Sequence, residues 1–145
     1  MRLLLIGFFG LIASTGIYAQ LEKVIHQTFE IEDVSRINLD FVDDYSVEVI
    51  LWAGNNIMTE TQIHLYGASP VILKHFVEKE KRYELVLDNT DGIVDLYNFD
   101  KERKAIRTKN GECIEQVKLR IFVPDNFESL NDSSLTKKVK TSDGD

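Results

Sequence analysis

Apolar and polar residues alternate with a period of two along most of the chain. In one such segment Ile37, Leu39 and Phe41 are apolar, and the residues between them are polar. Because successive side chains of a strand point to opposite faces, this alternation predicts strands with one buried face and one face in water. A wet face is typical of antiparallel sheets, since buried parallel strands are apolar throughout. The pattern occurs in the segments Phe29–Ile31, Ile37–Phe41, Tyr45–Val49, Ile57–Leu65, Tyr83–Leu87 and Val117–Ile121.

Turn-forming residues separate these segments. They are found at 43–44, 53–56, 89–92 and 110–111, and they include the pairs Asp91-Gly92 and Asn110-Gly111. Asp-Gly and Asn-Gly supply the positive φ angles that tight hairpins need. Short strands joined by turns predict a mainly β domain, whose antiparallel sheet packs as a sandwich or as a solenoid-like stack.

One segment has a helical pattern instead. Ser69 and Pro70 are suited to the N-cap and the first turn of a helix. The apolar pairs Ile72-Leu73 and Phe76-Val77 follow at helical spacing, with polar residues on the other side. We expect one short amphipathic helix at about 70–80, which packs its apolar stripe on the sheet.

Residues 1–19 have the pattern of a secretory signal peptide. Arg2 precedes an apolar run from Leu3 to Ala13, the small and polar residues 14–16 follow, and the small Ala19 precedes the expected cleavage point. A membrane anchor is the alternative, but crossing a bilayer needs about 20 apolar residues. We therefore expect an exported, periplasmic or extracellular protein, cleaved near Ala19, with no membrane span in its mature form.

The charge of the mature chain limits its partners. Removal of residues 1–19 leaves 16 basic and 24 acidic side chains, a net charge of −8. Nucleic acids and anionic membrane surfaces attract clustered Lys and Arg. Neither is therefore an expected partner.

The remaining length suits one domain. We expect residues 20–130 to form a single β-rich domain and residues 131–145, which contain few apolar side chains, to form a disordered tail. Cys113 is the single cysteine, so no internal disulfide can form. No His or basic cluster lies near it in sequence, which predicts an inert thiol.

The sequence predicts no catalytic, cofactor-binding or metal-ligating residues. The histidines His26, His64 and His75 are not at zinc-ligand spacing and are expected on wet faces. Neither a nucleophile elbow nor a phosphate-binding glycine loop occurs. Asp88–Gly92 is superficially similar to a calcium loop, but a hairpin turn is the preferred interpretation.

Two groups of side chains could still carry a function. The acids of the segment Asp40–Asp44 could serve a small envelope hydrolase, because paired carboxylates cleave glycosidic bonds. Trp52, Tyr66 and Tyr97 lie near strand ends, where rings can stack on sugars or anchor a protein. Packing in the core or at a sheet edge is the preferred interpretation of the rings.

Several segments resemble a known family. Residues 29–37 (Phe-Glu-Ile-Glu-Asp-Val-Ser-Arg-Ile) and Tyr45–Val49 resemble the opening of secreted adhesin head-domain proteins of Gram-negative envelopes. Lys81–Leu85 and Ile121–Asp125 are similar to segments of small exported, uncharacterised relatives of those proteins. The resemblance covers about residues 24–127. It implies β-rungs or a β-sandwich, a periplasmic or surface location and no established enzymatic activity.

These observations together favour a non-enzymatic protein. We expect an exported cell-envelope protein that acts as a binding or structural, adhesin-like module, without a cofactor. Its mechanism would be contact of a sheet face or an edge strand with an envelope protein or glycan. The alternative is the small hydrolase that uses the acids near Asp40–Asp44.

Overall fold

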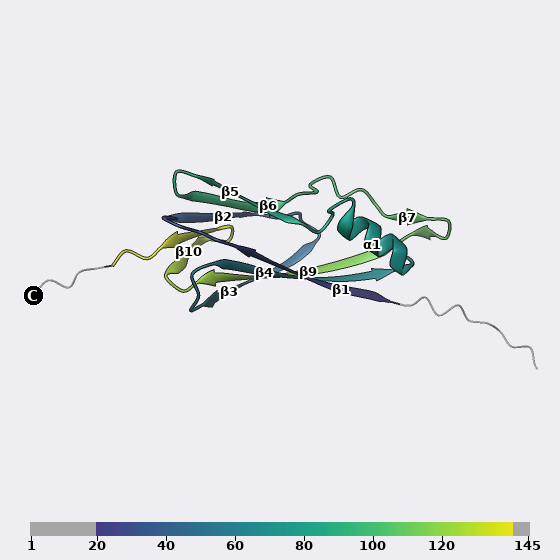
Figure 1. Ribbon diagram of the computed structural model, residues 1–145, viewed down its shortest axis with the longest axis horizontal. Coiled ribbons are helices and arrows are strands. Elements are labelled where there is room, and N and C mark those ends of the chain that lie inside the picture. The colour runs from purple at the N-terminus through teal and green to yellow at the C-terminus, as the bar shows by residue number, and fades with distance from the viewer. Residues whose placement is uncertain (1–19, 141–145) are drawn as a thin grey trace, which may run out of the picture.

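The alternating segments form two sheets that face each other. The computed structural model describes residues 20–140 (Figure 1). The first sheet has four strands in the order β1 (Leu21–Phe29), β4 (Ile57–Tyr66), β9 (Ile114–Pro124), β3 (Tyr45–Trp52). The second has five in the order β10 (Phe127–Asn131), β11 (Ser134–Lys137), β2 (Arg36–Asp40), β6 (Ile93–Asn98), β5 (Leu85–Thr90). A small hairpin, β7 (Arg107–Thr108) and β8 (Gly111–Glu112), and the helix α1 (Pro70–Glu78) complete the fold.

A single hydrophobic core fills the space between the sheets, so the protein is mainly β and packs as a sandwich. The buried side chains lie at the positions that alternation predicts, and those of β4 follow the period of two along the whole strand. A fully buried Val, Leu or Ile stabilises the fold by roughly 1.5–3 kcal/mol. The first sheet contributes Ile57, Ile63, Leu65, Leu119, Ile121 and Val123, and the second Ile37, Leu85, Val94, Leu96, Phe127 and Leu135.

Two strand pairs are parallel, which the alternation did not predict. β3 runs parallel to β9, and β2 runs parallel to β6. β3 and β4 follow each other in the chain and run in opposite directions, and β9 is inserted between them. Because β9 is antiparallel to β4, it has to be parallel to β3. An insertion by a distant strand leaves no trace in the local pattern of either neighbour.

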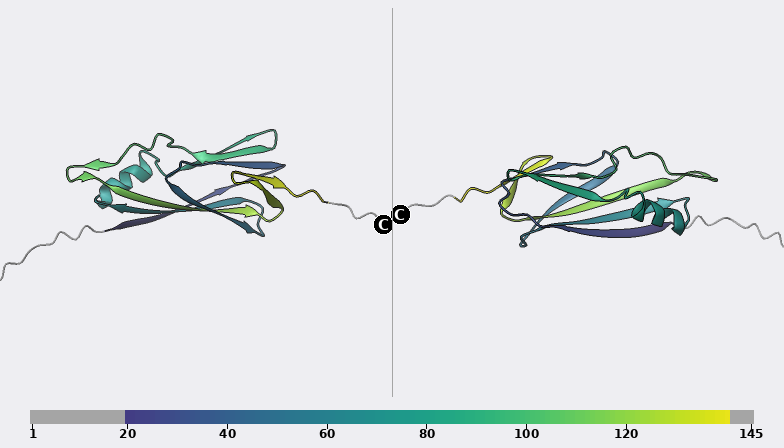
Figure 2. Two further views of the ribbon diagram at one scale, coloured as in Figure 1. Left: turned by 180° about the vertical axis from the view of Figure 1, so that it is seen from behind. Right: turned by 45° about the horizontal axis from the view of Figure 1, so that its top comes forward.

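The helix covers one end of the inner face of the first sheet, beyond the second sheet. α1 and the second sheet lie on the same side of the first sheet, at opposite ends of the molecule (Figure 2). The Ser69 hydroxyl accepts a hydrogen bond from the Ile72 N–H, and Pro70 occupies the first turn. Leu73 is buried, and Ile72 and Phe76 pack against the core. The predicted amphipathic helix is confirmed.

The predicted glycine turns are hairpins in the structure. Asp91 (φ 53°) and Gly92 (φ 81°) join β5 to β6, and Gly111 (φ 112°) is the first residue of β8, directly after the turn from β7. The Asn89 side chain accepts a hydrogen bond from the Gly92 N–H at 3.1 Å. This side chain therefore stabilises the turn, as the hairpin interpretation of Asp88–Gly92 requires.

The prediction of a disordered tail from residue 131 is wrong for residues 134–137. They form β11, which pairs with β2 on one side and with β10 on the other. Leu135 is buried in the core. Backbone pairing on both edges and one buried side chain order this polar segment, although its composition alone could not offset the entropy of ordering. Residues 141–145 lie outside the described residues.

The predicted signal peptide, residues 1–19, also lies outside the described residues. Within residues 20–140, no helix is long and apolar enough to cross a membrane.

A buried threonine of β4, Thr61, allows a stability prediction. Thr61 is fully buried on the inner face, and its hydroxyl has no hydrogen-bond partner among the described residues. A buried polar group without a partner costs about 1–3 kcal/mol. We expect Thr61→Val to raise the free energy of unfolding by about 1 kcal/mol. Urea unfolding followed by Trp52 fluorescence measures this change.

Thr28 on β1 provides the control, because it is exposed. Thr28→Val should change the free energy of unfolding by less than about 0.5 kcal/mol. A lower stability of Thr61→Val than of the wild type would contradict the prediction.

Candidate functional site

The acids singled out in the sequence line one pocket. Its volume is about 540 Å³, and it is bounded by residues 40–44 together with Lys101 and Arg103. The Lys101 ammonium lies 3.3 Å from the Asp40 carboxylate, and the Arg103 guanidinium lies 3.4 Å from that of Asp44. The Asp40 and Asp44 side chains are 74% and 54% exposed. A general acid of a glycosidase needs apolar surroundings in which a carboxyl group keeps its proton. Asp40 and Asp44 instead lie in water beside cations.

The aromatic candidates do not form one binding platform. Trp52 lies at the Pro124 end of the first sheet and Tyr66 at the Ile114 end, whereas Tyr97 belongs to the second sheet. The Trp52 ring lies on Gly54, where an added Cβ would be 2.0 Å from the indole, and its Nε1 donates to the carbonyl of Asn56 at 2.9 Å. Trp52 therefore stabilises its own turn.

Tyr97 is held by its neighbours on the outer face of the second sheet. Its hydroxyl donates to the Asp88 carboxylate at 2.6 Å, and this hydrogen bond raises the pKa of Tyr97. The Lys101 ammonium lies 4.5 Å from the centre of the ring. One face of the ring is thus already occupied by a cation.

The histidines and the cysteine are placed as the sequence predicted. His26 and His75 have side chains that are 70% and 53% exposed, and His64 lies on the outer face of β4. Partial desolvation raises the pKa of Glu60, but hydrogen bonds from His26 and Arg120 outweigh it and lower that pKa. Burial, together with two nearby acids, raises the pKa of the Cys113 thiol, which therefore stays protonated and unreactive.

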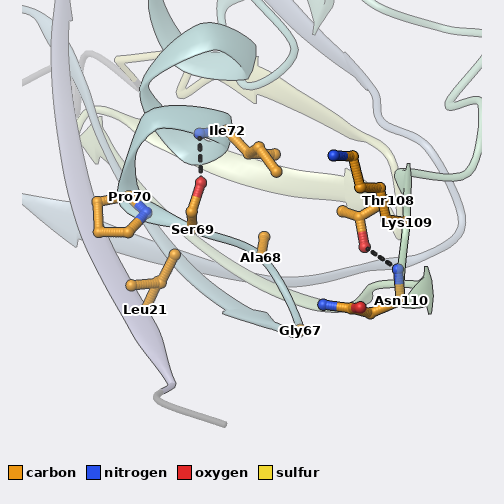
Figure 3. Close-up of a pocket in the computed structure, with 9 residues that line it drawn as sticks. All are labelled: Leu21, Gly67, Ala68, Ser69, Pro70, Ile72, Thr108, Lys109 and Asn110. Carbon is orange, nitrogen blue, oxygen red and sulfur yellow. Dashed lines mark hydrogen bonds between the residues drawn. The ribbon is translucent and has the colours of Figure 1, made fainter.

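An apolar pocket of about 640 Å³ lies between the start of α1 and the β7–β8 hairpin (Figure 3). The Ser69 hydroxyl that faces it is bonded to the Ile72 N–H, and the Thr108 hydroxyl accepts from the Asn110 N–H at 3.2 Å. Lys109 carries the only charge among the lining residues. These hydroxyls stabilise the local turns, and the pocket wall offers no arrangement for chemistry.

A buried ionic network was not predicted from the sequence. Glu115 of β9 accepts hydrogen bonds from Arg82 at 3.0 Å and from the Tyr83 hydroxyl at 2.5 Å, and Arg103 contacts its other oxygen. The side chains of Arg82, Arg103 and Glu115 are 6%, 7% and 10% exposed. The network joins β9 to the segment after α1 and to the loop before β7. The sequence does contain a hint of the network. Glu115 lies two residues before Val117, so its charged side chain points to the same inner face of β9, where apolar residues are expected.

Burial or neighbouring charges favour the protonated forms of three groups in and beside this network: Tyr45, Tyr83 and Arg82. Burial raises the pKa of Tyr45 to about 12 and also raises that of Tyr83, whose bond to Glu115 adds to the effect. Burial alone would lower the pKa of Arg82, but the hydrogen bond and charge of Glu115 raise it overall. The Arg103 guanidinium lies 5.1 Å from the centre of the Tyr45 ring. These raised pKa values favour the protonated forms of Tyr45, which packs inside the fold, and of Tyr83 and Arg82, which donate hydrogen bonds there.

β3 has apolar side chains on its inner face that the second sheet does not cover. Val47, Val49 and Leu51 are 41%, 40% and 47% exposed, although they share a face with buried residues of β9. Only Tyr45 of this strand is buried on that face. The prediction that the apolar face of Tyr45–Val49 is buried is therefore wrong for Val47 and Val49, because local alternation does not show how far the facing sheet extends.

The free edge of β3 is also unpaired. Among residues 20–140 the strand pairs with β9 alone. The Trp52 carbonyl accepts the Asp125 N–H at 2.8 Å, so the backbone groups of the even-numbered residues face β9. In a strand, the backbone groups of neighbouring residues point to opposite edges. The N–H and C=O groups of Val47, Val49 and Leu51 therefore point outward at the free edge.

The other sheet edges carry features that block pairing. The Gln27 side chain of β1 accepts from the Leu85 N–H at 2.9 Å and donates to the Leu85 carbonyl at 3.1 Å, which occupies the backbone groups of the first residue of β5. β1 places the charged Lys23 on its inner face. β10 is short and has a bulge between Ser129 and Asn131. Such features protect edges from pairing, and within the described residues β3 has none of them: it has regular register and neither Lys nor Pro.

Comparison with protein-family models, curated proteins and solved structures found no match to this chain. The class that the described residues define is thus a structural one: a two-sheet β-sandwich with one long, unprotected edge strand. We call this surface the β3 edge, meaning the outward backbone groups and the side chains of Val47, Val49 and Leu51.

Proposed function

We propose that the protein is an exported cell-envelope module that binds a partner through surface contact, as a structural or adhesin-like component, and not an enzyme. The β3 edge is the observation that carries this proposal. It combines free backbone donors and acceptors with half-exposed apolar side chains. Edge strands of this kind bind extended segments by adding a strand to the sheet.

The chemistry of the edge supports this function. Backbone hydrogen bonds contribute affinity without regard to sequence, and alternate side chains supply selectivity. The polarity of an envelope glycan does not suit a row of Val and Leu, so a protein partner is favoured over a sugar. The alternative, hydrolysis by the acids near Asp40, has less support. The carboxylates of Asp40 and Asp44 are exposed to water and paired with cations.

Affinity capture from envelope extract with the tagged full chain tests the proposal. Val49→Lys places a charge in the centre of the edge, while Ile93→Lys places one on an equally exposed residue of β6, since both side chains are 40% exposed. We expect Val49→Lys to reduce recovery of a defined partner at least tenfold, since a tenfold loss corresponds to about 1.4 kcal/mol. Recovery by Ile93→Lys should equal that of the wild type.

The same cells provide the test of export. The chain should fractionate with the periplasm or the medium, and its N-terminus should be Gln20 after cleavage. Equal recovery by the Val49→Lys and Ile93→Lys variants would contradict binding through β3. A chain retained in the cytoplasm would contradict the envelope location.

A further inference from the structure

We propose that the partner of the β3 edge is a second copy of this chain, bound antiparallel about a two-fold axis at Val49. This inference rests on the proposed function, because it names the occupant of the same surface. It is argued from the direction of the backbone groups, from the charge on β3 and from the placement of its apolar side chains.

The backbone groups of β3 are suited to pairing with themselves. Residues that face each other in an antiparallel ladder exchange two hydrogen bonds when the backbone groups of both point into the seam. Those of Val47, Val49 and Leu51 all point to the free edge. Pairing about Val49 places Val49 opposite the second copy's Val49, and Val47 opposite the second copy's Leu51. Each outward residue thus meets an outward residue.

Two neighbouring registers also join outward residues, one about Glu48 and one about Ile50. Pairing about Ile50 would set Val47 opposite Ala53, which lies beyond the strand, and charge disfavours pairing about Glu48. Glu48 is the only charged residue of β3. Pairing about Glu48 would satisfy the same backbone groups but would set two carboxylates directly opposite each other, which is destabilising. Pairing about Val49 sets Glu48 opposite the second copy's Ile50. The Arg120 guanidinium of β9, 3.7 Å from the Glu48 carboxylate, partly balances that charge within each copy.

Pairing about Val49 also shields the apolar side chains. In this register odd-numbered residues lie opposite odd-numbered residues. Because directly opposed residues share a face, both copies place their inner faces on the same side of the joint sheet. Val47, Val49 and Leu51 of the two copies then form one continuous apolar row across the seam. Each of these side chains gains an apolar neighbour at the edge where it now meets water.

Sedimentation of the full chain, as the cell processes it, tests the pairing. At about 0.1 mM we expect a dimer for the wild type and for Ile93→Lys, and a monomer for Val49→Lys. The dimer dissociation constant of Val49→Lys should be at least tenfold higher than that of the wild type. Val49→Lys would oppose two ammonium groups at the two-fold axis. Since a misfolded variant would also be monomeric, circular dichroism of the three proteins has to agree.

Cross-linking tests the register in a Cys113→Ala background. Directly opposed residues of such a hydrogen-bonded pair have Cα atoms about 5.5 Å apart, within the range of a disulfide. We expect Val49→Cys to form a disulfide-linked dimer with itself. Val47→Cys should not do so alone, but should cross-link when mixed with Leu51→Cys. Cross-linking of Val47→Cys with Val49→Cys instead would show the register about Glu48, and cross-linking of Val49→Cys with Leu51→Cys would show the register about Ile50. Either result would overturn ours.

The outcomes separate this inference from the proposed function. A wild-type monomer whose envelope partner is lost in Val49→Lys would overturn the pairing of two copies and leave partner binding intact, with an extended segment of another protein as the occupant. A dimer that Val49→Lys does not dissociate would overturn the assignment to β3. A monomer that recovers no envelope partner would contradict both proposals.

Discussion

Replacement of Glu115 by glutamine is expected to lower the free energy of unfolding by about 3–5 kcal/mol. The glutamine keeps the shape of the side chain but removes the negative charge between Arg82 and Arg103, whose side chains are 6% and 7% exposed. Two buried guanidinium groups would then rely on Asp100 and Asp44 at 3.5 and 3.4 Å. These acids are more exposed and cannot replace a buried carboxylate that both cations contact.

Urea unfolding of the two proteins measures the loss. Glu112→Gln is the matched control, because the Glu112 carboxylate is 61% exposed and lies 3.8 Å from Arg107. Exposed pairs contribute little, so this control should lose less than about 0.5 kcal/mol. Similar small losses in the two variants would mean that the network around Glu115 does not stabilise the fold. Since the free energy of unfolding of a small domain is about 5–15 kcal/mol, the expected loss is a large part of the total stability.

Gly92→Ala is expected to destabilise the protein by about 2–3 kcal/mol. Gly92 has φ of 81°, which is costly for a residue with a Cβ atom, and an added Cβ would lie 2.8 Å from the backbone oxygen of Asp33. The Gly92 carbonyl also accepts the Ser35 N–H at 2.8 Å. A shift of the turn to relieve the contact would weaken this bond between the β5–β6 hairpin and the start of β2.

Gly111→Ala separates the two effects. Gly111 also has a positive φ, of 112°, but an added Cβ would meet nothing within 4 Å. We expect this variant to lose about 1 kcal/mol, the cost of the backbone conformation alone. Thermal unfolding of the two variants compares them. Equal losses would show that the contact with Asp33 adds nothing.

Features encoded by neighbouring residues could be predicted from the sequence. The period of two along β4 reflects only that side chains alternate between faces, and Ser69-Pro70 acts within one turn of the helix. The turn at Asp91-Gly92 likewise depends on two residues and their φ angles. Such elements carry their own signal, and the structure confirms them.

Features that depend on distant residues could not be predicted in the same way. β11 is ordered because β2 and β10 lie on either side of it, about 100 residues and a few residues away in sequence. Whether Val49 is covered depends on the extent of the second sheet, which its own neighbours do not determine. Glu115 is a charged residue at an inward-facing position of β9, which marks it as unusual. Its partners Arg82 and Arg103, however, come from other segments of the chain.

The cap that Gln27 places on Leu85 determines how large an assembly could grow. A subunit with two sheet edges that can pair forms open filaments. A subunit with one self-complementary edge forms a dimer and does not grow further. On the far side Gln27 of β1 occupies the backbone of Leu85, and β1 carries the inward-facing Lys23, so two-fold pairing through β3 would use the unprotected edge of the described sheets. The expected product is a closed dimer, and closure at two copies prevents growth of a fibre through this edge.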